Sequence, residues 1–437
     1  MRVAVVGTGI AGNAAAFALN RKHQITVYER ELRPGGHSHT VEIDYDGRRL
    51  AVDTGFIVYN EPNYPELTGL FAHLGVATQA TQMSFSVSAN GGALEWMGGG
   101  DKLGETLNGV FAQRSNLFSI PFLGMLRDMH RFNRNCLEDR EAGRLAGLSL
   151  GEYLQARGYS RRLVHDYLVP MGAAIWSSPV DRVLDFPAEN FVAFFHNHRL
   201  LHYERPVWRT VEGGSRCYVD KITAPFRDRI RYGAAVTGIE RTRSGVSITD
   251  SLGHTETYDQ VVIGAHPDQA LAMLTDASDS EHQVLGAIRY RPNAVYLHRD
   301  TRLMPKRRRA WAAWNFLRDN GRSEGSGDIA ITYWMNALQG VDPACPLFVS
   351  LNPPFEPEAT LTFGRFTCDH PQFDRAAFGA QARLDDIQGV NRTWFCGAWT
   401  GYGFHEDGLR SGLSVADRLG ADVPWRRSPL PFAEAAE

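Results

Sequence analysis

Cysteine is scarce in this sequence, and the cysteines that occur form no recognisable framework. The five are widely spaced, and no two of them make a CxxC pair: Cys136, Cys217, Cys345, Cys368 and Cys396. An odd, irregular set argues against a disulfide scaffold and against a cysteine-ligated zinc site. We therefore predict no metal site and a reducing, cytoplasmic location.

Long apolar runs and a strong net charge are also missing. No stretch of about 20 apolar residues occurs, so no membrane-spanning helix is expected. The formal net charge of −3 gives no reason to expect a nucleic acid partner. The chain starts almost directly in an apolar strand-like segment, so no signal peptide is expected. A chain of 437 residues predicts two or three structural units.

The first thirty residues predict a dinucleotide-binding βαβ unit. An apolar run, 3–6, leads into Gly7-Thr8-Gly9-Ile10-Ala11-Gly12, then into an alanine-rich helical segment and a second strand that ends at Glu29. In this pattern the first glycine makes the tight turn, the second lets a pyrophosphate approach, and the third allows close helix–strand packing. The amino end of the helix would face the phosphates, and Glu29 would bind the adenosine ribose.

The next segment favours FAD over NAD. It reads Glu29-Arg30-Glu31-Leu32-Arg33-Pro34-Gly35-Gly36-His37. A double glycine shortly after the ribose acid lets a second backbone segment approach a bound cofactor closely. A plain Pro-Gly turn would explain residues 34–35, but not why both follow the ribose acid. We expect His37 to contact the flavin phosphates or to lie near the ring.

A third segment of the predicted flavin site lies near the carboxy terminus. The strand 394–396 ends at Gly397-Ala398, and a loop then feeds a glycine-rich helix 408–419 that Asp407 caps. The amino end of such a helix can lie under the flavin pyrimidine ring, where its dipole stabilises negative charge. An ordinary strand–helix connection is the alternative. Val236, on a strand that follows a Gly213-Gly214 loop, is placed to touch the adenine edge.

The fold class predicted from these patterns is α/β, α+β overall, with a Rossmann-like FAD-binding domain and a discontinuous substrate domain of helices and a mixed sheet. The FAD-binding domain is expected to comprise 1–90, 207–290 and 390–424, the substrate domain 91–206 and 291–389, and a tail 425–437. The sequence predicts a hairpin across Asp46-Gly47 and helices over 101–198, one opened by a capping box at Ser149. Further strands are expected at 83–88, 93–96, 234–240, 246–249, 260–263, 294–298, 329–334 and 347–351, and further helices at 64–74 and 374–387.

These segments resemble the flavin-containing amine oxidase and phytoene desaturase superfamily. Within it, the chain is similar to the FAD-dependent oxidoreductase-like domain of plant cyclopropane fatty acid synthases and to its free-standing bacterial relatives. The resemblance runs through nearly the whole chain. It rests on Gly35-Gly36-His37, Asp53-Thr54-Gly55-Phe56, Met83–Val87, Ile175-Trp176-Ser177, Met304-Pro305-Lys306, Ala313-Trp314-Asn315, Leu351-Asn352-Pro353, Trp394–Ala398 and Gly401–Leu409.

The resemblance implies an amine oxidase-like architecture and several further cofactor contacts. We expect the cofactor to be bound by Thr54, Gly55, Phe56, Gly397, Ala398, Asp407, Gly408 and Leu409, besides the amino-terminal residues above. Two positions depart from the broader superfamily, which usually has Gly-Asp where this chain has Gly397-Ala398 and often Gly-Gly-Arg where it has Gly-Gly-His. Both departures agree with the narrower group and make simple amine oxidase chemistry less secure.

The same resemblance implies lipid chemistry. We expect oxidation of an unsaturated or methylated fatty acyl chain, bound to phospholipid, by hydride transfer to flavin N5. Two alternatives stay open: a flavin amine oxidase on a soluble amine, and a non-redox flavoprotein that supports a lipid methyltransferase or cyclopropane synthase-type partner. The sequence itself contains no methyltransferase region.

Candidate catalytic groups lie in the loop before the last helix. His405 and Glu406 are candidate bases. Hydrogen bonding of the loop is the alternative for each. Tyr402 is a candidate aromatic wall of the substrate site, together with Phe56, Trp176 and Trp314.

Two surface features bear on peripheral membrane contact. One is an apolar patch around Pro121, for which a buried helix is the alternative. The other is a basic cluster, which a solvated charge run would also explain. The patch comprises Leu117, Phe118, Ile120, Phe122, Leu123, Met125, Leu126, Met129 and Phe132, and the cluster Arg302, Lys306, Arg307, Arg308 and Arg309.

Overall fold

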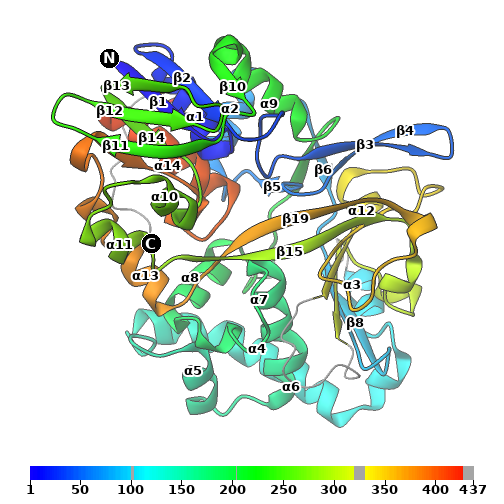
Figure 1. Cartoon of the computed structure of the whole chain (residues 1–437). Coiled ribbons are helices and arrows are strands. Elements are labelled where there is room, and N and C mark those ends of the chain that lie inside the picture. The colour runs from blue at the N-terminus through cyan, green and yellow to red at the C-terminus, as the bar shows by residue number, and fades with distance from the viewer. Residues whose placement is uncertain (100–102, 203, 319–329, 427–437) are drawn as a thin grey trace.

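A parallel sheet of five strands carries the glycine-rich segment. The structure is a computed structural model that describes residues 1–99, 103–202, 204–318 and 330–426. In the order β10-β2-β1-β14-β20 (Figure 1), the strands are Ile230–Tyr232, Gln24–Glu29, Arg2–Val6, Gln260–Ile263 and Thr393–Phe395. Strands from the beginning, middle and end of the chain are therefore neighbours. This arrangement confirms the predicted Rossmann-like sheet.

Two helices, α1 (Ile10–Leu19) and α14 (His405–Arg418), pack closely together beside this sheet. All ten residues of α1 are buried, because alanines and Gly12 present almost no bulk. A Cβ atom on Gly412 of α14 would lie 2.1 Å from the carbonyl oxygen of Ala11. The two helices can therefore be this close only with glycine at that position.

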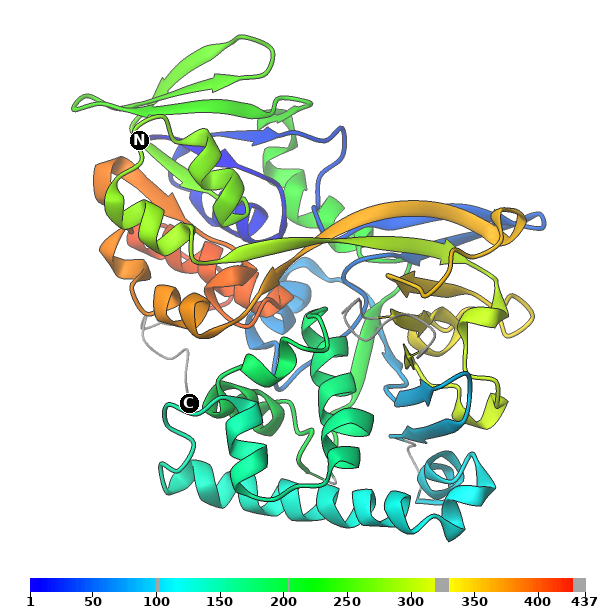
Figure 2. The same cartoon turned by 60° about the horizontal axis from the view of Figure 1, so that its bottom comes forward.

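A mixed sheet of seven strands forms the second layer, in the order β19-β15-β18-β17-β16-β7-β8. β7 and β16 are parallel, and the other neighbours are antiparallel. β15 and β19 form the long twisted ribbon that Figure 2 shows reaching from the nucleotide side of the molecule to its far side. In chain order the strands are β7 (Phe85–Ala89), β8 (Leu94–Gly98), β15 (Arg289–His298), β16 (Trp314–Arg318), β17 (Ala330–Trp334), β18 (Phe348–Leu351) and β19 (Thr362–Gln372).

In the sequence, the segment between β8 and β9 is mainly helical, as predicted for 101–198. Residues 101 and 102 lie outside the described ranges. Ser149 opens α5 with the expected capping box, since its hydroxyl accepts from the Glu152 N–H at 3.2 Å and its own N–H donates to the Glu152 carboxylate at 2.7 Å. The helices are α3 (Leu103–Val110), α4 (Ile120–Glu141), α5 (Leu150–Ala156), α6 (Arg161–Leu163), α7 (Val169–Trp176) and α8 (Ala188–Asn197).

Smaller elements complete the fold. The predicted hairpin is confirmed, with Asp46 at φ 52° and Gly47 at φ 87°, as a tight two-residue turn requires. The remaining strands are β3 (Thr40–Tyr45), β4 (Arg48–Asp53), β5 (Tyr59–Asn60), β6 (Thr78–Thr81), β9 (Trp208–Val211), β11 (Val236–Arg241), β12 (Val246–Asp250) and β13 (Thr255–Tyr258). The remaining helices are α2 (Pro65–Leu74), α9 (Arg216–Thr223), α10 (Pro267–Met273), α11 (Asp279–Leu285), α12 (Met335–Gln339) and α13 (Arg375–Gln381).

Several elements differ from the sequence expectations. β19 was not predicted, and the expected helix 374–387 ends as α13 at Gln381. β7 falls within the range predicted for the FAD-binding domain, but it pairs with β8 and β16 in the mixed sheet. At the carboxy terminus, Trp425 and Arg426 both donate to the Glu66 carboxylate at 2.8 Å, so these two residues of the predicted tail are anchored. Residues 427–437 and Ile329 lie outside the described ranges.

The apolar patch around Pro121 divides into two parts in α4. Phe122, Met125 and Phe132 are fully buried, whereas Phe118 and Ile120 are exposed. The prediction that a buried helix explains the patch therefore holds for one face only. None of the helices in the described ranges combines the length and the apolar character that a membrane span requires.

Candidate functional site

The loop between β1 and α1 has the geometry of a phosphate cradle. Gly7 adopts φ 92°, and a Cβ on Gly12 would lie only 2.0 Å from the Gly7 carbonyl oxygen, so the loop is as tight as predicted. A Cβ on Gly9, by contrast, would meet no atom within 4 Å. The first turn of α1 has no side-chain cap and no acidic residue. Open space thus adjoins an uncapped helix amino end, which suits a pyrophosphate.

Glu29 lies at the end of β2, directly beside this loop. Its carboxylate is buried and accepts hydrogen bonds from the Thr8 backbone N–H at 2.9 Å and from the Thr8 hydroxyl. Arg30 is exposed and pairs with Glu31. The Glu29 carbonyl accepts from the N–H of Ala234, two residues before Val236 in β11. Glu29 is therefore adjacent to the glycine loop, where the ribose-binding prediction needs it.

The double glycine lies against the first loop. The Gly35 N–H donates to the Thr8 carbonyl at 3.0 Å, and a Cβ on Gly36 would lie 3.0 Å from Gly9 Cα. Next to them, Nε2 of His37 is buried without a hydrogen-bond partner. Burial lowers the pKa of His37. An unpartnered buried polar atom beside two glycine loops fits the binding of a polar cofactor there.

The predicted cofactor residues 54–56 pair with the segment that follows Gly36. The Phe56 N–H donates to the His37 carbonyl and the Thr54 N–H to the His39 carbonyl, both at 2.9 Å. A Cβ on Gly55 would lie 2.0 Å from the same His37 oxygen. The preceding Asp53 was not among the predicted site residues.

The buried Asp53 carboxylate joins these strands to the amino end of α9. It accepts from the Ser215 backbone N–H at 2.9 Å, from the Ser215 hydroxyl at 2.8 Å and from the Thr40 hydroxyl at 2.6 Å. In the sequence, Asp53 begins the segment 53–56 and Ser215 follows the double glycine at 213–214. Nothing in the sequence indicates that Ser215 donates hydrogen bonds to Asp53.

The carboxy-terminal loop brings the amino end of α14 to the amino end of α1. The Gly397 N–H donates to the Ser411 hydroxyl at 2.9 Å. A Cβ on Gly408 would lie 2.8 Å from Ile10 Cγ2 and 3.5 Å from the Ala398 nitrogen. Leu409 is fully buried. The structure thus brings the predicted cofactor segments 7–12, 29–37, 54–56 and 397–409 into one place.

Asp407 is buried and shapes the loop that precedes α14. Its Oδ2 accepts from the Tyr402 N–H at 3.0 Å and from the Phe404 N–H at 2.9 Å, and its Oδ1 lies 3.3 Å from Arg410. Burial raises its pKa. These bonds also explain why α14 begins at His405, three residues before the predicted start. The observed contacts of Asp407 are with the loop, so its predicted contact with the cofactor stays a prediction.

His405, a predicted catalytic residue, connects several site segments. Its ring stacks on Phe56 with 3.9 Å between centroids. Its Nε2 lies 2.6 Å from the Tyr218 hydroxyl and 3.3 Å from the Ser38 hydroxyl. Burial lowers the pKa of His405 to about 3, so the imidazole is neutral near pH 7. Tyr218 on α9 and Ser38 were not predicted; their only sequence signal is that each follows a double glycine.

Glu406, the other predicted base, is turned towards α2. Its two carboxylate oxygens accept from the backbone N–H groups of Glu66 and Leu67 at 2.9 and 3.0 Å, in the first turn of that helix. The carboxylate is buried, and burial raises its pKa to about 7. A side chain held in this way caps a helix and fastens α14 to α2.

Replacing Glu406 by alanine is expected to reduce stability. Two buried N–H groups would lose their acceptors, which costs about 1–3 kcal/mol of unfolding free energy per unsatisfied group. Urea denaturation of the FAD-loaded protein measures this loss. Glu152→Ala is a matched control, because Glu152 caps α5 in an exposed position and should cost less. An E406A variant of unchanged stability that has lost all flavin reduction would instead support the predicted role as a base.

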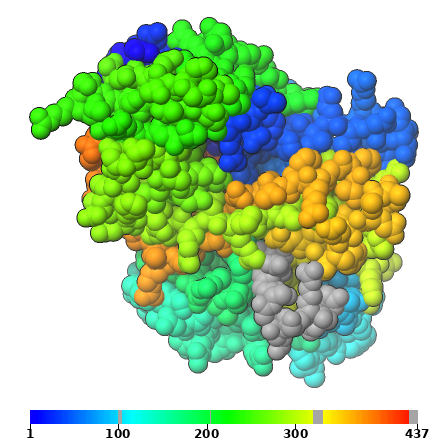
Figure 3. All heavy atoms as spheres, in the orientation of Figure 1, coloured from blue at the N-terminus to red at the C-terminus, as the bar shows by residue number. Residues whose placement is uncertain are grey.

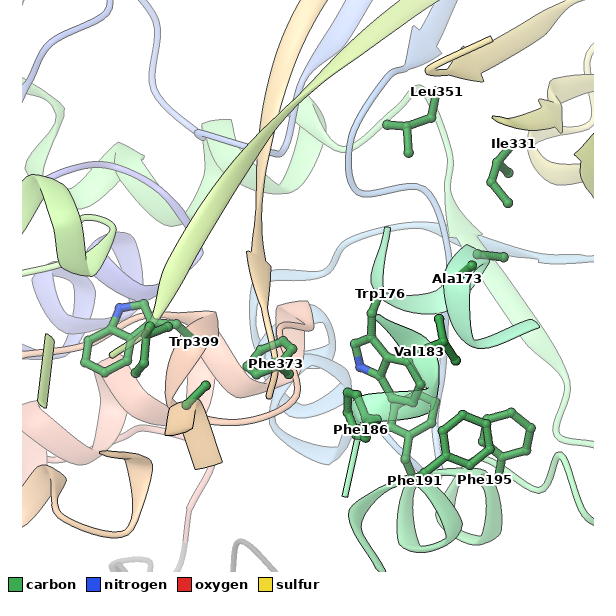
Figure 4. Packing of buried hydrophobic residues seen from close by; sticks show 14 of the residues in the cluster. Ala173, Trp176, Val183, Phe186, Phe191, Phe195, Ile331, Leu351, Phe373 and Trp399 are labelled. Carbon is green, nitrogen blue, oxygen red and sulfur yellow. The ribbon is translucent and has the colours of Figure 1, made fainter. Parts of the chain in front are cut away.

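Tyr402 lies against an aromatic wall from the helical part of the molecule. Its ring centroid is 5.5 Å from Phe194 on α8 and 5.9 Å from Phe378 on α13. Phe404 stacks on Phe194 at 5.1 Å. Trp176 from α7 lies 4.8 Å from Phe194, and Figure 4 shows it gathered with Phe186, Phe191 and Phe195.

The fourth predicted wall residue, Trp314, is on β16. Its ring packs on Tyr333, with 5.2 Å between the centroids, and not on the aromatic residues around Tyr402. The aromatic wall of the Tyr402 group therefore comes from α7, α8 and α13, with Trp314 placed apart from it.

A parallel sheet with a dinucleotide cradle, joined to a mixed sheet and to helices that bring aromatic side chains to Tyr402, is the architecture of a flavin-dependent oxidoreductase. The model of the flavin-containing amine oxidoreductase family matches residues 10–350. The chain belongs to this family, and FAD is its cofactor.

A curated relative and several solved structures are similar to the chain. A Mycobacterium tuberculosis protein provisionally named as the flavin-containing monoamine oxidase AofH is 28% identical over 286 residues, covering 63% of this chain. The chain spans 59% of the length of that relative.

Putrescine oxidase bound to putrescine superposes with a TM-score of 0.68 at 16% identity, covering 96% of this chain and 99% of the other. A CLA-producing fatty acid isomerase from P. acnes superposes with a TM-score of 0.64 at 16% identity, covering 95% of this chain and 98% of the isomerase. At such identities the structures share the fold.

Proposed function

We propose that the protein is an FAD-dependent desaturase of an unsaturated or methylated fatty acyl chain carried on a phospholipid. The observation that carries this proposal is the neutral, aromatic character of the side chains around the loop 402–405. An acyl chain has no charge to pair, whereas an ammonium substrate favours a nearby carboxylate, and Glu406 and Asp407 accept backbone N–H groups instead. The fold does not choose between substrates, because it is shared by proteins named for amine oxidation and for fatty acid isomerisation.

The histidines of this region are held in their neutral forms, although Arg140 and Glu189 are close enough to act on the Tyr402 hydroxyl. Burial lowers the pKa of His198 to about 4 and the pKa of His405 to about 3, so both imidazoles are uncharged near pH 7. Burial also raises the pKa of the Tyr402 hydroxyl. The two carboxylates of the loop, Glu406 and Asp407, accept backbone N–H groups instead of facing the aromatic wall.

The resemblance to the domain of plant cyclopropane fatty acid synthases supports the same substrate class. The motifs that carry it include Ile175-Trp176-Ser177 and the loop 401–409. In the structure these two segments meet through Phe194, which contacts Trp176 on one side and Tyr402 and Phe404 on the other. The resemblance and the aromatic wall therefore concern the same place in the molecule.

The chemistry divides between the cofactor and the chain. Bound FAD supplies a two-electron oxidant able to accept a hydride, and its electrons pass on to dioxygen or to a protein carrier. In this proposal the acyl group lies against the half-buried rings of Tyr402 and Phe404, which the buried ring of Phe194 supports, and the chain excludes water from it. Formation of the new carbon–carbon double bond also releases one proton, for which the imidazole of His405, with Nε2 2.6 Å from the Tyr218 hydroxyl, is the candidate acceptor.

Anaerobic titration of the FAD-loaded protein with defined lipids tests the proposal. We expect the visible flavin absorbance to bleach with phospholipids that carry unsaturated or methyl-branched unsaturated chains. Saturated phospholipids of equal length are the matched control and should leave the spectrum unchanged, because they lack an allylic C–H bond.

The contrary outcomes identify the alternatives. Bleaching by soluble amines and by no lipid would make the protein an amine oxidase. A flavin that dithionite reduces but that neither substrate class reduces, together with a stable complex with a lipid methyltransferase, would indicate a non-redox supporting role.

A further inference from the structure

Exposed apolar side chains gather at one corner of the molecule, around the start of α4. Eleven large hydrophobic residues are exposed among those that the structure describes, and five of them fall between residues 107 and 123. Phe118 and Ile120 are 86% and 84% exposed. Figure 2 shows the start of α4, in cyan, at an outer corner, and Figure 3 shows the same colour at the lower right edge. An exposed apolar cluster of this size marks an interaction surface.

The local fold does not require these side chains to be apolar. Phe122 and Met125 on the inner face of α4 are fully buried and supply the packing of its first turns. The helix start is fixed independently by Ser119, whose hydroxyl accepts from the Phe122 N–H at 3.4 Å. Phe118 and Ile120 flank this cap and point outwards. Their apolar character therefore serves something outside the chain.

A basic segment is held at the same corner by Glu95 of β8. The Glu95 carboxylate accepts from the backbone N–H groups of Lys306 and Arg307 at 2.7 and 3.1 Å. The backbone of Glu95 meanwhile bonds the side chains of Gln113 and Asn116, at 3.0 and 3.3 Å, just before the apolar residues. One strand thus fixes the basic segment and the apolar turn next to each other.

Positive charge predominates around the apolar residues. Arg114, Lys306 and Arg309 are exposed, and Glu105 is the single acidic residue between positions 103 and 127 of the sequence. Arg308 lies flat on Trp311, 3.7 Å from the ring centroid. Apolar side chains ringed by arginine and lysine match the surface of an anionic bilayer, with acyl tails below and phosphates above.

We propose that this corner docks the protein on anionic lipid bilayers. The inference concerns where the protein lies and does not require the reaction proposed above. The docking corner, as the term is used below, consists of Leu117, Phe118, Ile120 and Leu123, with Arg114, Lys306 and Arg309.

Co-sedimentation of the FAD-loaded protein with vesicles tests the docking corner. We expect binding to vesicles of phosphatidylcholine with phosphatidylglycerol, weaker binding to phosphatidylcholine alone, and weakening by 0.5 M salt, as surface charge requires. Phe118→Ser with Ile120→Ser should lower the partition coefficient at least about tenfold. Lys306→Glu with Arg309→Glu should also lower the partition coefficient on anionic vesicles at least about tenfold, and should leave it nearly unchanged on neutral vesicles.

Matched controls separate the docking corner from general surface properties. Leu252→Ser with Val390→Ser removes two exposed apolar side chains elsewhere, and Arg229→Glu with Arg243→Glu reverses two exposed charges elsewhere. Both controls should bind like the unaltered protein. The proposal would be overturned if a control variant lost as much vesicle binding as the corresponding variant of the docking corner. A complete absence of vesicle binding at low salt would also overturn it.

A second copy of the chain is the other occupant that an apolar surface can accept. Analytical ultracentrifugation in the absence of lipid detects it. A dimer that Phe118→Ser with Ile120→Ser converts to a monomer, without vesicle binding, would overturn the proposal. Flavin content and thermal unfolding verify that each variant is folded. Because vesicle binding is measured without turnover, its failure is distinguishable from failure of the proposed desaturase reaction.

Discussion

Replacing Gly12 by alanine is expected to yield a protein that does not retain FAD. The new Cβ would lie 2.0 Å from the Gly7 carbonyl oxygen and 3.8 Å from Val5. Both partners belong to the strand and loop that form the phosphate cradle, so the backbone has to move. Overpacking of this kind costs about 1–3 kcal/mol; if the whole cost falls on the FAD-bound cradle, the FAD dissociation constant rises about five- to 150-fold.

Titration of the apoprotein with FAD, followed by flavin fluorescence, measures this change. Gly379→Ala in α13 is the matched control, because a Cβ there would meet no atom within 4 Å. It should bind FAD normally and be as stable as the unaltered protein or slightly more stable, since alanine favours helices over glycine. FAD affinity that is the same in G12A and G379A would show that the tight packing of α1 on its loop is not needed for the cofactor.

The second large effect is expected at His405. If its neutral imidazole accepts the substrate proton, His405→Ala should slow flavin reduction by the substrate about 10²- to 10⁴-fold, the usual contribution of a general base. FAD affinity should change far less, because the glycine loops remain. Stopped-flow absorbance under anaerobic conditions measures the rate, with dithionite reduction as the reference.

A matched variant separates proton transfer from positioning. Tyr218→Phe removes the hydroxyl that lies 2.6 Å from Nε2 of His405 but keeps the ring and the base. It should slow the reaction less than the loss of the imidazole does. An H405A variant that reduces its flavin at the rate of the unaltered protein would refute the role of His405 as base and leave it as a support between Phe56 and α9.

The parts of the site that sequence predicted are those whose physics is local. Gly7 predicts a tight turn and Gly12 a helix packed closely on its strand. Glu29 ends the second strand, at the spacing that a ribose-binding acid needs. Gly408 and Asp407 similarly predict the amino end of α14, although the helix begins at His405, three residues before the predicted start. Such features depend on neighbours within one βαβ or strand–loop–helix unit, which a sequence displays directly.

The parts that sequence missed depend on contacts between distant segments. The bonds of His405 to Tyr218 and Ser38 join residues 187 and 367 positions apart, and no local pattern encodes them. Glu406 was a candidate base because it lies in the loop before the last helix, and that loop does not reveal its hydrogen bonds to the first turn of α2. β19 contains glycine and proline, which disfavour strands, and its full-length pairing with β15 overrides that preference.

The contact between α1 and α14 also sets the order in which the protein can mature. Residues 10–19 are synthesised before residues 405–418, the helix that packs against them. At usual translation rates about 20–80 s separate the two events. During this interval α1, all of whose residues are buried in the folded protein, lacks its partner, and the carboxy-terminal part of the predicted cofactor site is absent. The predicted cofactor site can therefore be completed only after α14 has been made, and a chaperone that shields α1 until then would raise the yield of holoprotein.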